Sequence, residues 1–223
     1  MSDSRPAILD RIRRNLENEG AESERIFAVR ERLENHPSGV VPKGPRTRLQ
    51  IVKLFCSKAK AAGATVAQIK RGNEANAISK YLREKNLPQR LRMGESRRLK
   101  RIKWPARSGP EIAIGPSDGQ DLVGLSHAFG AIAESGTLVM LSGNDNPTTL
   151  NFLPENHIVV VDTKDVVNDH ESVWARVRKA YGGQDMPRTI NMITGPSRSA
   201  DIEQTLIMGA HGPVRLHILV VKD

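Results

Sequence analysis

Three polar, glycine-rich segments hold most of the side chains in this 223-residue chain that could do chemistry. They are IGPSDGQDLVG (114–124), AIAESGTLVMLSG (131–143) and TGPSRSADIEQTLIMGAHGP (194–213), each beside an apolar run typical of a strand. Glycine lets the backbone approach a ligand closely, and hydroxyl and backbone N–H groups are donors for anions. These segments therefore predict a binding site for a small anionic ligand.

Within these segments, Glu134 is the candidate base or nucleophile, and Arg198 is the candidate group for a carboxylate or phosphate. The planar fork of N–H donors on arginine matches the geometry of both anions. We expect nine residues to converge on one pocket, in which Ser135 and Thr137 orient the ligand. They are Glu134, Ser135, Gly136, Thr137, Ser197, Arg198, Asp201, Glu203 and His211. The full set of candidate ligand-binding residues is Ser135, Gly136, Thr137, Ser142, Gly195, Ser197, Arg198, Asp201, Glu203, His211 and Gly212.

The same residues also have purely structural interpretations. Residues 134–137 have the composition of a hairpin turn, and residues 199–203 could begin a short helix, where acids are favoured in the first turn. Residues 211–213 could form a rigid turn before the last strand, and Asp118 and Asp121 are residue types common in turns. The residue types alone leave both interpretations open.

Sequence motifs for common cofactors are missing from the chain. It has no G-x-G-x-x-G, G-x-x-x-x-G-K-[ST], H-E-x-x-H or C-x-x-C, and its six histidines are dispersed. Cys56 is the single cysteine, whereas an iron–sulfur cluster usually takes about four thiolates. We expect Cys56 to be a buried, inert thiol, and we predict neither a metal site nor a cofactor bound by this chain.

Helices and short apolar strands must position these segments. The pattern predicts helices over 47–62, 73–86 and 170–181, the last with Val173, Trp174, Val177 and Tyr181 on one face. Strands are expected at 64–69, 89–93, 111–115, 157–162, 189–194 and 215–221. The run HIVVVD (157–162) is typical of a strand buried on both faces. The alternation predicts an α/β fold with a Rossmann-like, mostly parallel sheet whose ligands bind beyond the carboxyl ends of the strands.

The first residues form a separate region. Apolar residues recur at helical spacing between Ser4, a candidate N-cap, and Gly20, and a second helical pattern covers 22–34. The proline- and glycine-rich segment 36–45 is typical of a linker. The expected organisation is an N-terminal helical arm (1–35), a linker (36–45) and an α/β domain (46–223).

Charge is distributed unevenly along the chain, whose net charge is +9. Residues 1–110 have a net charge of +15 and residues 111–223 one of −6, and the run RLRMGESRRLKRIKWPAR (90–107) has eight bases and one acid. Such a run could bind nucleic acid, an acidic partner or an anionic ligand. Aromatic residues make up only 4% of the chain, which argues against a stacking surface for single strands, so nucleic acid is the least favoured partner. A secretory signal and an apolar run of ~18 residues are both missing, so we expect a cytoplasmic protein without a membrane span.

Several long segments resemble the lactate utilization protein C family, which carries the LUD domain. They are DLVGLSHAFGAIAESGTLVMLSG, PTTLNFLPENHIVVV, WARVRKAYG and MPRTINMITGPSRSADIEQTLIMGAHGPVRLHILVV. The resemblance runs from about residue 110 to the end of the sequence, with Ser199 where the family commonly has threonine, and is looser over 20–107. It implies a fold like that of the sugar-isomerase and CoA-transferase superfamily. It also implies a cytoplasmic role in oxidising L-lactate to pyruvate, beside two partner proteins that hold iron–sulfur clusters.

Two functions follow from the residues and the resemblance together. The first is a non-redox component of a lactate-oxidation system that binds a small anionic ligand or a partner subunit through the three segments. The second is an enzyme that uses Glu134 as nucleophile or base on a carboxylate, acyl-CoA or sugar-phosphate substrate, as similar CoA transferases use a loop glutamate.

Overall fold

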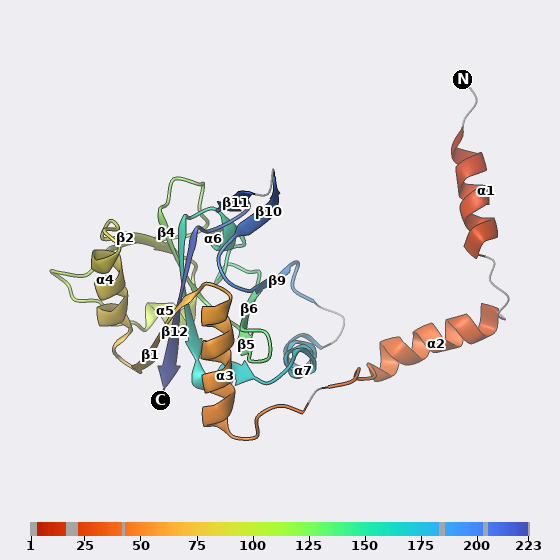
Figure 1. Ribbon diagram of the computed structural model, residues 1–223, viewed down its shortest axis with the longest axis horizontal. Helices are drawn as coiled ribbons and strands as arrows, with labels where there is room; N and C mark the ends of the chain where they lie inside the picture. The colour runs from red at the N-terminus through yellow and green to blue at the C-terminus, as the bar shows by residue number, and fades with distance from the viewer. Residues whose placement is uncertain (1–3, 17–21, 42, 183–185, 203–204, 223) are drawn as a thin grey trace. The chain divides into compact units, whose positions relative to one another are not determined.

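The computed structural model describes residues 4–16, 22–41, 43–182, 186–202 and 205–222. The chain divides into two units, residues 1–40 and 41–223. The first unit consists of two helices, α1 (Ser4–Leu16) and α2 (Glu22–Asn35), which agree with the two helical patterns at the start of the sequence (Figure 1). The second unit holds the sheets and the remaining helices.

A parallel sheet forms the centre of the second unit. In the described residues it has six strands in the order β1-β12-β7-β4-β2-β3, and all of its pairings are parallel. The strands are β1 (Thr65–Lys70), β2 (Arg90–Met93), β3 (Glu111–Ile114), β4 (Val123–His127), β7 (Asn156–Asp162) and β12 (Arg215–Lys222). The predicted α/β fold with a mostly parallel sheet is confirmed.

Helices cover both faces of this sheet, with α3 (Arg48–Ala61) on one face and α4 (Glu74–Glu84) with α5 (Arg97–Lys100) on the other (Figure 1). Strand β7 shows why both faces are buried. Val159 and Val161 pack into the core on the α3 side, and Ile158 and Val160 pack into the core on the α4 side. Alternate residues of a strand point to opposite faces, so a continuous apolar run suits this position.

A smaller sheet has the strand order β8-β5-β6-β9 in the described part of the chain. Its strands are β5 (Gly130–Ile132), β6 (Thr137–Leu141), β8 (Val166–Val167) and β9 (Ile190–Ile193). Leu138 and Met140 share the core on the α3 side, whereas Val139 packs against Val173 and Val177 of α7 (His170–Tyr181). Trp174 and Tyr181 pack against the same cluster, so the predicted apolar face of this helix is confirmed.

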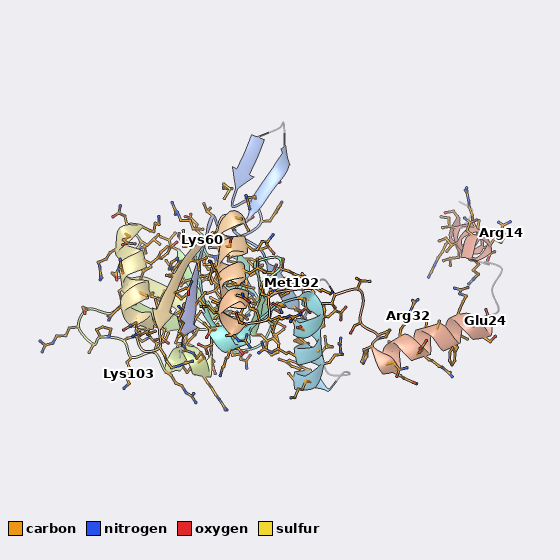
Figure 2. All side chains as sticks on the ribbon, turned by 60° about the horizontal axis from the view of Figure 1, so that its bottom comes forward. Arg14, Glu24, Arg32, Lys60, Lys103 and Met192 are labelled. Carbon is orange, nitrogen blue, oxygen red and sulfur yellow. The ribbon has the colours of Figure 1, made fainter. Side chains whose placement is uncertain are left out.

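The remaining elements are short. They are α6 (Thr149–Phe152), the 3-10 helix η1 (Thr163–Asp165) and the antiparallel strands β10 (Arg198–Ile202) and β11 (Thr205–Met208). Strands β10 and β11 form a ribbon that projects from the body of the second unit (Figures 1 and 2). Residues 199–202 are therefore extended, so the short-helix interpretation of this segment is wrong.

Cys56 lies in the core on the α3 side and is 5% exposed, which confirms the expected buried thiol. Burial raises the pKa of this thiol because the charged thiolate is disfavoured in an apolar environment. Among the described residues, the helices are too short or too polar to cross a bilayer.

Candidate functional site

The structure joins two of the three predicted segments at a set of hydroxyl groups. Thr137 Oγ1 lies 2.7 Å from Ser135 Oγ and 2.6 Å from Thr194 Oγ1. Strands β6 and β9 pair antiparallel with Leu138 opposite Ile193, so the chain entering β6 meets the chain leaving β9. The turn at 134–137 and the start of the segment 194–213 are therefore neighbours.

Two glycines bring these segments against the end of α3. Gly136 has a φ of 72°, and a Cβ on it would lie 2.4 Å from the backbone nitrogen of Ala59. Gly195 has a φ of 77°, and its Cβ would lie 2.1 Å from the carbonyl oxygen of Ala62. Glycine is needed at both positions for close backbone approach, whether or not a ligand binds beside them.

Arg198 and Ser197 lie near the amino ends of β1 and β12. Arg198 Nη2 donates a hydrogen bond to the carbonyl oxygen of Ala62, which caps the end of α3. The Ser197 N–H donates to the carbonyl oxygen of Pro213 at 2.9 Å, and the His211 N–H donates to Ser197 Oγ at 3.2 Å. Gly212 lies beside the Ser197 side chain.

Other candidate residues point elsewhere. Glu134 Oε1 accepts hydrogen bonds from the backbone N–H of His170 at 3.1 Å and from its Nδ1 at 2.5 Å, so this carboxylate faces the start of α7. Ser142 bonds with Thr189 at the opposite end of β6 from Thr137. Asp201 lies in β10, and Glu203 lies outside the described residues.

The segment 114–124 follows β3 and uses its acids within the fold. Asp121 Oδ2 accepts from Arg92 Nε at 2.5 Å and from Ser117 Oγ at 2.8 Å. Asp118 Oδ1 accepts from the backbone N–H of Gln120 at 3.0 Å, a bond typical of a turn. The geometry of both acids agrees with their interpretation as turn formers.

A second group of functional side chains lies beyond the carboxyl ends of the parallel strands. We call this the carboxyl-edge cluster: Arg71 and Glu74 after β1, Arg98 after β2, His127 at the end of β4 and Asp162 at the end of β7. Arg98 Nε donates to both oxygens of Asp162 at 3.3 and 3.2 Å, and Arg98 Nη2 donates to Glu74 Oε1 at 2.7 Å. Arg71 Nη2 lies 3.4 Å from Asp162 Oδ1.

Both carboxylates of this cluster are buried and ionised. The side chains of Glu74 and Asp162 are 4% and 5% exposed. Burial alone would raise the pKa of each carboxyl, but hydrogen bonds and positive charge from Arg98 outweigh it and hold both pKa values below their usual range. Arg71 adds to the effect on the pKa of Asp162.

His127 has an unsatisfied polar atom in this cluster. Its Nε2 is buried and has no hydrogen-bond partner within the described residues, with Asp162 Oδ2 the nearby charge at 3.9 Å. Burial lowers the pKa of His127 and outweighs the opposing attraction of Asp162, so the ring is neutral at pH 7. A neutral imidazole can accept or donate a proton.

His127, Asp162 and Asp165 could together present three metal ligands, whose donor atoms lie within 4.8 Å of one another. Both carboxylates are already paired with arginines, since Asp165 Oδ1 accepts from Arg176 at 2.8 Å. These guanidinium groups neutralise the charge that would attract a cation. The ion pairs therefore argue against a cation held by this group.

Arg98 lines two hollows. The first, which we call the His127 hollow, has a volume of about 490 Å³ and is lined by Glu95, Ser96, Arg97, Arg98, His127, Asn144 and Asp145. The second, which we call the Arg101 hollow, has a volume of about 340 Å³ and is lined by Arg71, Gly72, Glu74, Arg98, Arg101, Ile102 and Lys103. Their formal charges differ, because acids and bases balance in the first and bases exceed acids by three in the second.

The predicted strands contained a signal for this cluster. Asp162 is the last residue of HIVVVD, and Arg71 and Glu74 follow the strand predicted at 64–69. Parallel strands end at one edge, so polar residues that follow separate strands can meet there. The predicted site was instead placed in the glycine-rich segments, and Ser197 and Arg198 of these segments lie near the amino ends of β1 and β12.

This arrangement defines an α/β protein with a parallel sheet and a charged carboxyl edge. The LUD domain model matches residues 48–221, and the chain belongs to this family. Lactate utilization protein C of Halalkalibacterium halodurans is 40% identical over 102 residues, which cover 45% of this chain and 44% of that protein. The uncharacterized protein YkgG of Escherichia coli is 32% identical over 174 residues, 75% of this chain and 71% of that one.

The match to the first of these relatives spans less than half of its length. Among solved structures, a DUF162 family protein from Deinococcus radiodurans has a TM-score of 0.55 at 22% identity. The similarity covers 79% of this chain and 99% of that one. It supports the α/β fold described above.

Proposed function

We propose that this chain takes part in lactate utilization, as a non-redox component of a system that oxidises L-lactate to pyruvate. The observation that carries the proposal is the similarity to relatives named lactate utilization protein C, two of which are 40% identical to it over 102 residues. The single cysteine supports the non-redox part, because it is buried in the core and a cluster usually takes about four thiolates. The electron-transfer step then belongs to partner proteins that hold iron–sulfur clusters.

The test uses the purified chain with L-lactate and an artificial electron acceptor. We expect no reduction of the acceptor by the chain alone, and reduction once the cluster-bearing partners are added. Deleting the gene should impair growth on L-lactate and leave growth on glucose unchanged. Lactate oxidation by the isolated chain, or normal growth of the deletion strain on L-lactate, would contradict the proposal.

A second candidate is acyl transfer through Glu134, and the pair of hydrogen bonds from His170 favours it. Both bonds go to Oε1 and fix the carboxylate, so Oε2 is the oxygen that would attack. Attack on an acyl-CoA would form a C–O bond, break the C–S bond and leave a mixed anhydride on Glu134 with CoA released as the thiolate.

This second candidate has its own test. The chain is incubated with acetyl-CoA and hydroxylamine, which converts an acyl anhydride at Glu134 into a hydroxamate that mass spectrometry locates. Wild type should form it and Glu134→Gln should not, with Glu84→Gln as the matched control on exposed surface. Wild-type chain without a hydroxamate at Glu134 would exclude this route.

A further inference from the structure

The basic run at 90–107 divides into two sets of residues in the structure. Arg92 and Arg98 are part of the fold, paired with Asp121 and with the two buried acids of the carboxyl-edge cluster. Arg101 and Lys103 are exposed and line the Arg101 hollow. Figure 2 shows Lys103 on the α4 side of the body. Two of the exposed bases of this run are therefore placed at one concave surface.

The charge in the Arg101 hollow has two layers. At its base, the guanidinium groups of Arg98 and Arg71 balance the carboxylates of Glu74 and Asp162. Beside these balanced charges, the exposed Arg101 and Lys103 add two positive charges. The base of the hollow is thus held by its own ion pairs, and the rim attracts anions.

The backbone at this hollow leaves room for a ligand. Gly72 lies in the connection from β1 to α4 with a φ of 91°, and nothing lies within 4 Å of where its Cβ would be. Helix α4, which begins at Glu74, has the positive end of its dipole at the same place. Its first acid accepts the Gly72 N–H at 2.7 Å, so the bases supply the main attraction for an anion.

We propose that the Arg101 hollow binds a small molecule through a phosphate group. Two positive charges, those of Arg101 and Lys103, remain beyond the ion pairs with Glu74 and Asp162, and they suit a dianion better than a monocarboxylate. Arginine and lysine are the side chains that recognise phosphate in proteins. The volume of about 340 Å³ accommodates a phosphorylated small molecule, and Ile102 offers it an apolar contact.

This inference does not rest on the role in lactate utilization, because binding by the purified chain is measured without growth or turnover. The probe is inorganic phosphate, titrated into the full chain in a calorimeter at low ionic strength and again at about 0.15 M salt. Malonate, a dicarboxylate dianion, and L-lactate, a monoanion, are titrated in parallel. We expect phosphate to bind at least about tenfold more tightly than either, since one additional charge-assisted hydrogen bond contributes about 1.5 kcal/mol or more.

A pair of double variants separates this site from general attraction. Arg101→Gln/Lys103→Gln removes two charges from the Arg101 hollow, and Arg97→Gln/Arg107→Gln removes two exposed charges of the same run outside it. The first should weaken phosphate binding at least about tenfold and the second less than about twofold. Circular dichroism should show that both double variants are folded. If the first double variant does not fold, Lys103→Glu replaces it in the phosphate titration.

Three outcomes would overturn the proposal. Equal weakening in the two double variants would show attraction by net charge alone. Malonate binding as tightly as phosphate would show recognition of charge without recognition of phosphate. Wild-type chain that binds no phosphate at low ionic strength would show that the hollow is not a phosphate site.

Discussion

Arg98 and Asp162 form the central ion pair of the carboxyl edge, with Nη2 of the guanidinium 3.0 Å from Oδ1 of the carboxylate. The two residues come from α5 and from the end of β7, which are 64 positions apart in the sequence. Arg98 also pairs with Glu74, so one guanidinium contacts two acids that are almost fully buried, and Arg71 supplies the second positive charge. The contacts of Arg98 with Asp162 and Glu74 therefore join residues at the ends of three separate strands.

Replacing Arg98 should destabilise the protein strongly. Arg98→Met leaves two buried carboxylates without their main partner, and breaking a buried ion pair costs about 3–5 kcal/mol. Urea unfolding measures the change in the free energy of unfolding. The matched control is Lys80→Met, whose pair with Glu84 is 71% and 58% exposed and should contribute less than about 1 kcal/mol. A loss of the same size in both variants would contradict the structural role of Arg98.

Sequence patterns identify the elements of this fold better than they identify the partners of charged residues. Alternating burial in β7 and the apolar face of α7 follow from local periodicity, which the sequence shows directly. The pairing of Arg98 with Asp162 depends on strand order, because β2 and β7 become close only through β4 between them. Local patterns contain no information on that order.

The hydroxyl contact of Thr137 with Thr194 shows the same limit in the predicted segments. Composition indicated that 134–137 and 194–213 are polar and glycine-rich, and the pairing of β6 with β9 joins them. The direction of Glu134 toward His170 depends on where α7 begins in space. Such side-chain directions are set by tertiary packing and cannot be read from residue types.

Gly136 should not tolerate a side chain. Gly136→Ala combines a positive φ with a Cβ 2.4 Å from the Ala59 nitrogen. Gly182→Ala is the control, because Gly182 has a φ of 69° and open space around its Cβ. The control should lose about 1–2 kcal/mol from the left-handed backbone alone. Gly136→Ala should lose about 1–3 kcal/mol more from overpacking. Equal losses in chemical denaturation would show that α3 can shift away from the turn.

Two buried histidines should make the stability depend on pH. Burial lowers the pKa of His157 to about 4, and burial with the nearby charge of Lys85 lowers the pKa of His217 to about 4. Histidines of the unfolded chain have a pKa of about 6.5, so between about pH 6.5 and 4 these two side chains bind more protons in the unfolded chain than in the folded chain. The free energy of unfolding should therefore decrease as the pH is lowered below about 6.5. At pH 5 the decrease from the value at neutral pH should be about 2 kcal/mol per histidine.

Variants assign this pH dependence to its source. His157→Gln and His217→Gln should each have a smaller decrease in the free energy of unfolding between pH 7 and 5 than wild type has. His157→Gln loses a hydrogen bond with Ser126 of 2.9 Å, and His217→Gln loses a ring stacked on Tyr81 with centroids 4.0 Å apart. The change of stability with pH is therefore compared, and not the absolute stability. His36→Asn, at an exposed position, should leave the wild-type decrease unchanged.

Arg198 tests whether the predicted anion site at the amino ends of β1 and β12 takes part in function. Its Nη2 donates to the carbonyl oxygen of Ala62, and the N–H groups not used in that bond are available for a carboxylate. Arg198→Ala should abolish growth on L-lactate in cells that depend on this chain. It should cost only about 1 kcal/mol of stability, because the residue is exposed and loses one hydrogen bond.

The control for Arg198→Ala is Lys60→Ala, which removes an exposed positive charge from the same end of α3 (Figure 2). Growth on L-lactate and the melting temperature are measured for both variants, with growth on glucose as the reference. Lys60→Ala should grow like wild type, since among the described residues Lys60 has no hydrogen bond to the hydroxyl groups of Ser135, Thr137 and Thr194. Growth of Arg198→Ala at the wild-type rate would assign Arg198 to capping α3 alone, and anion binding would then belong to the carboxyl edge around Arg98.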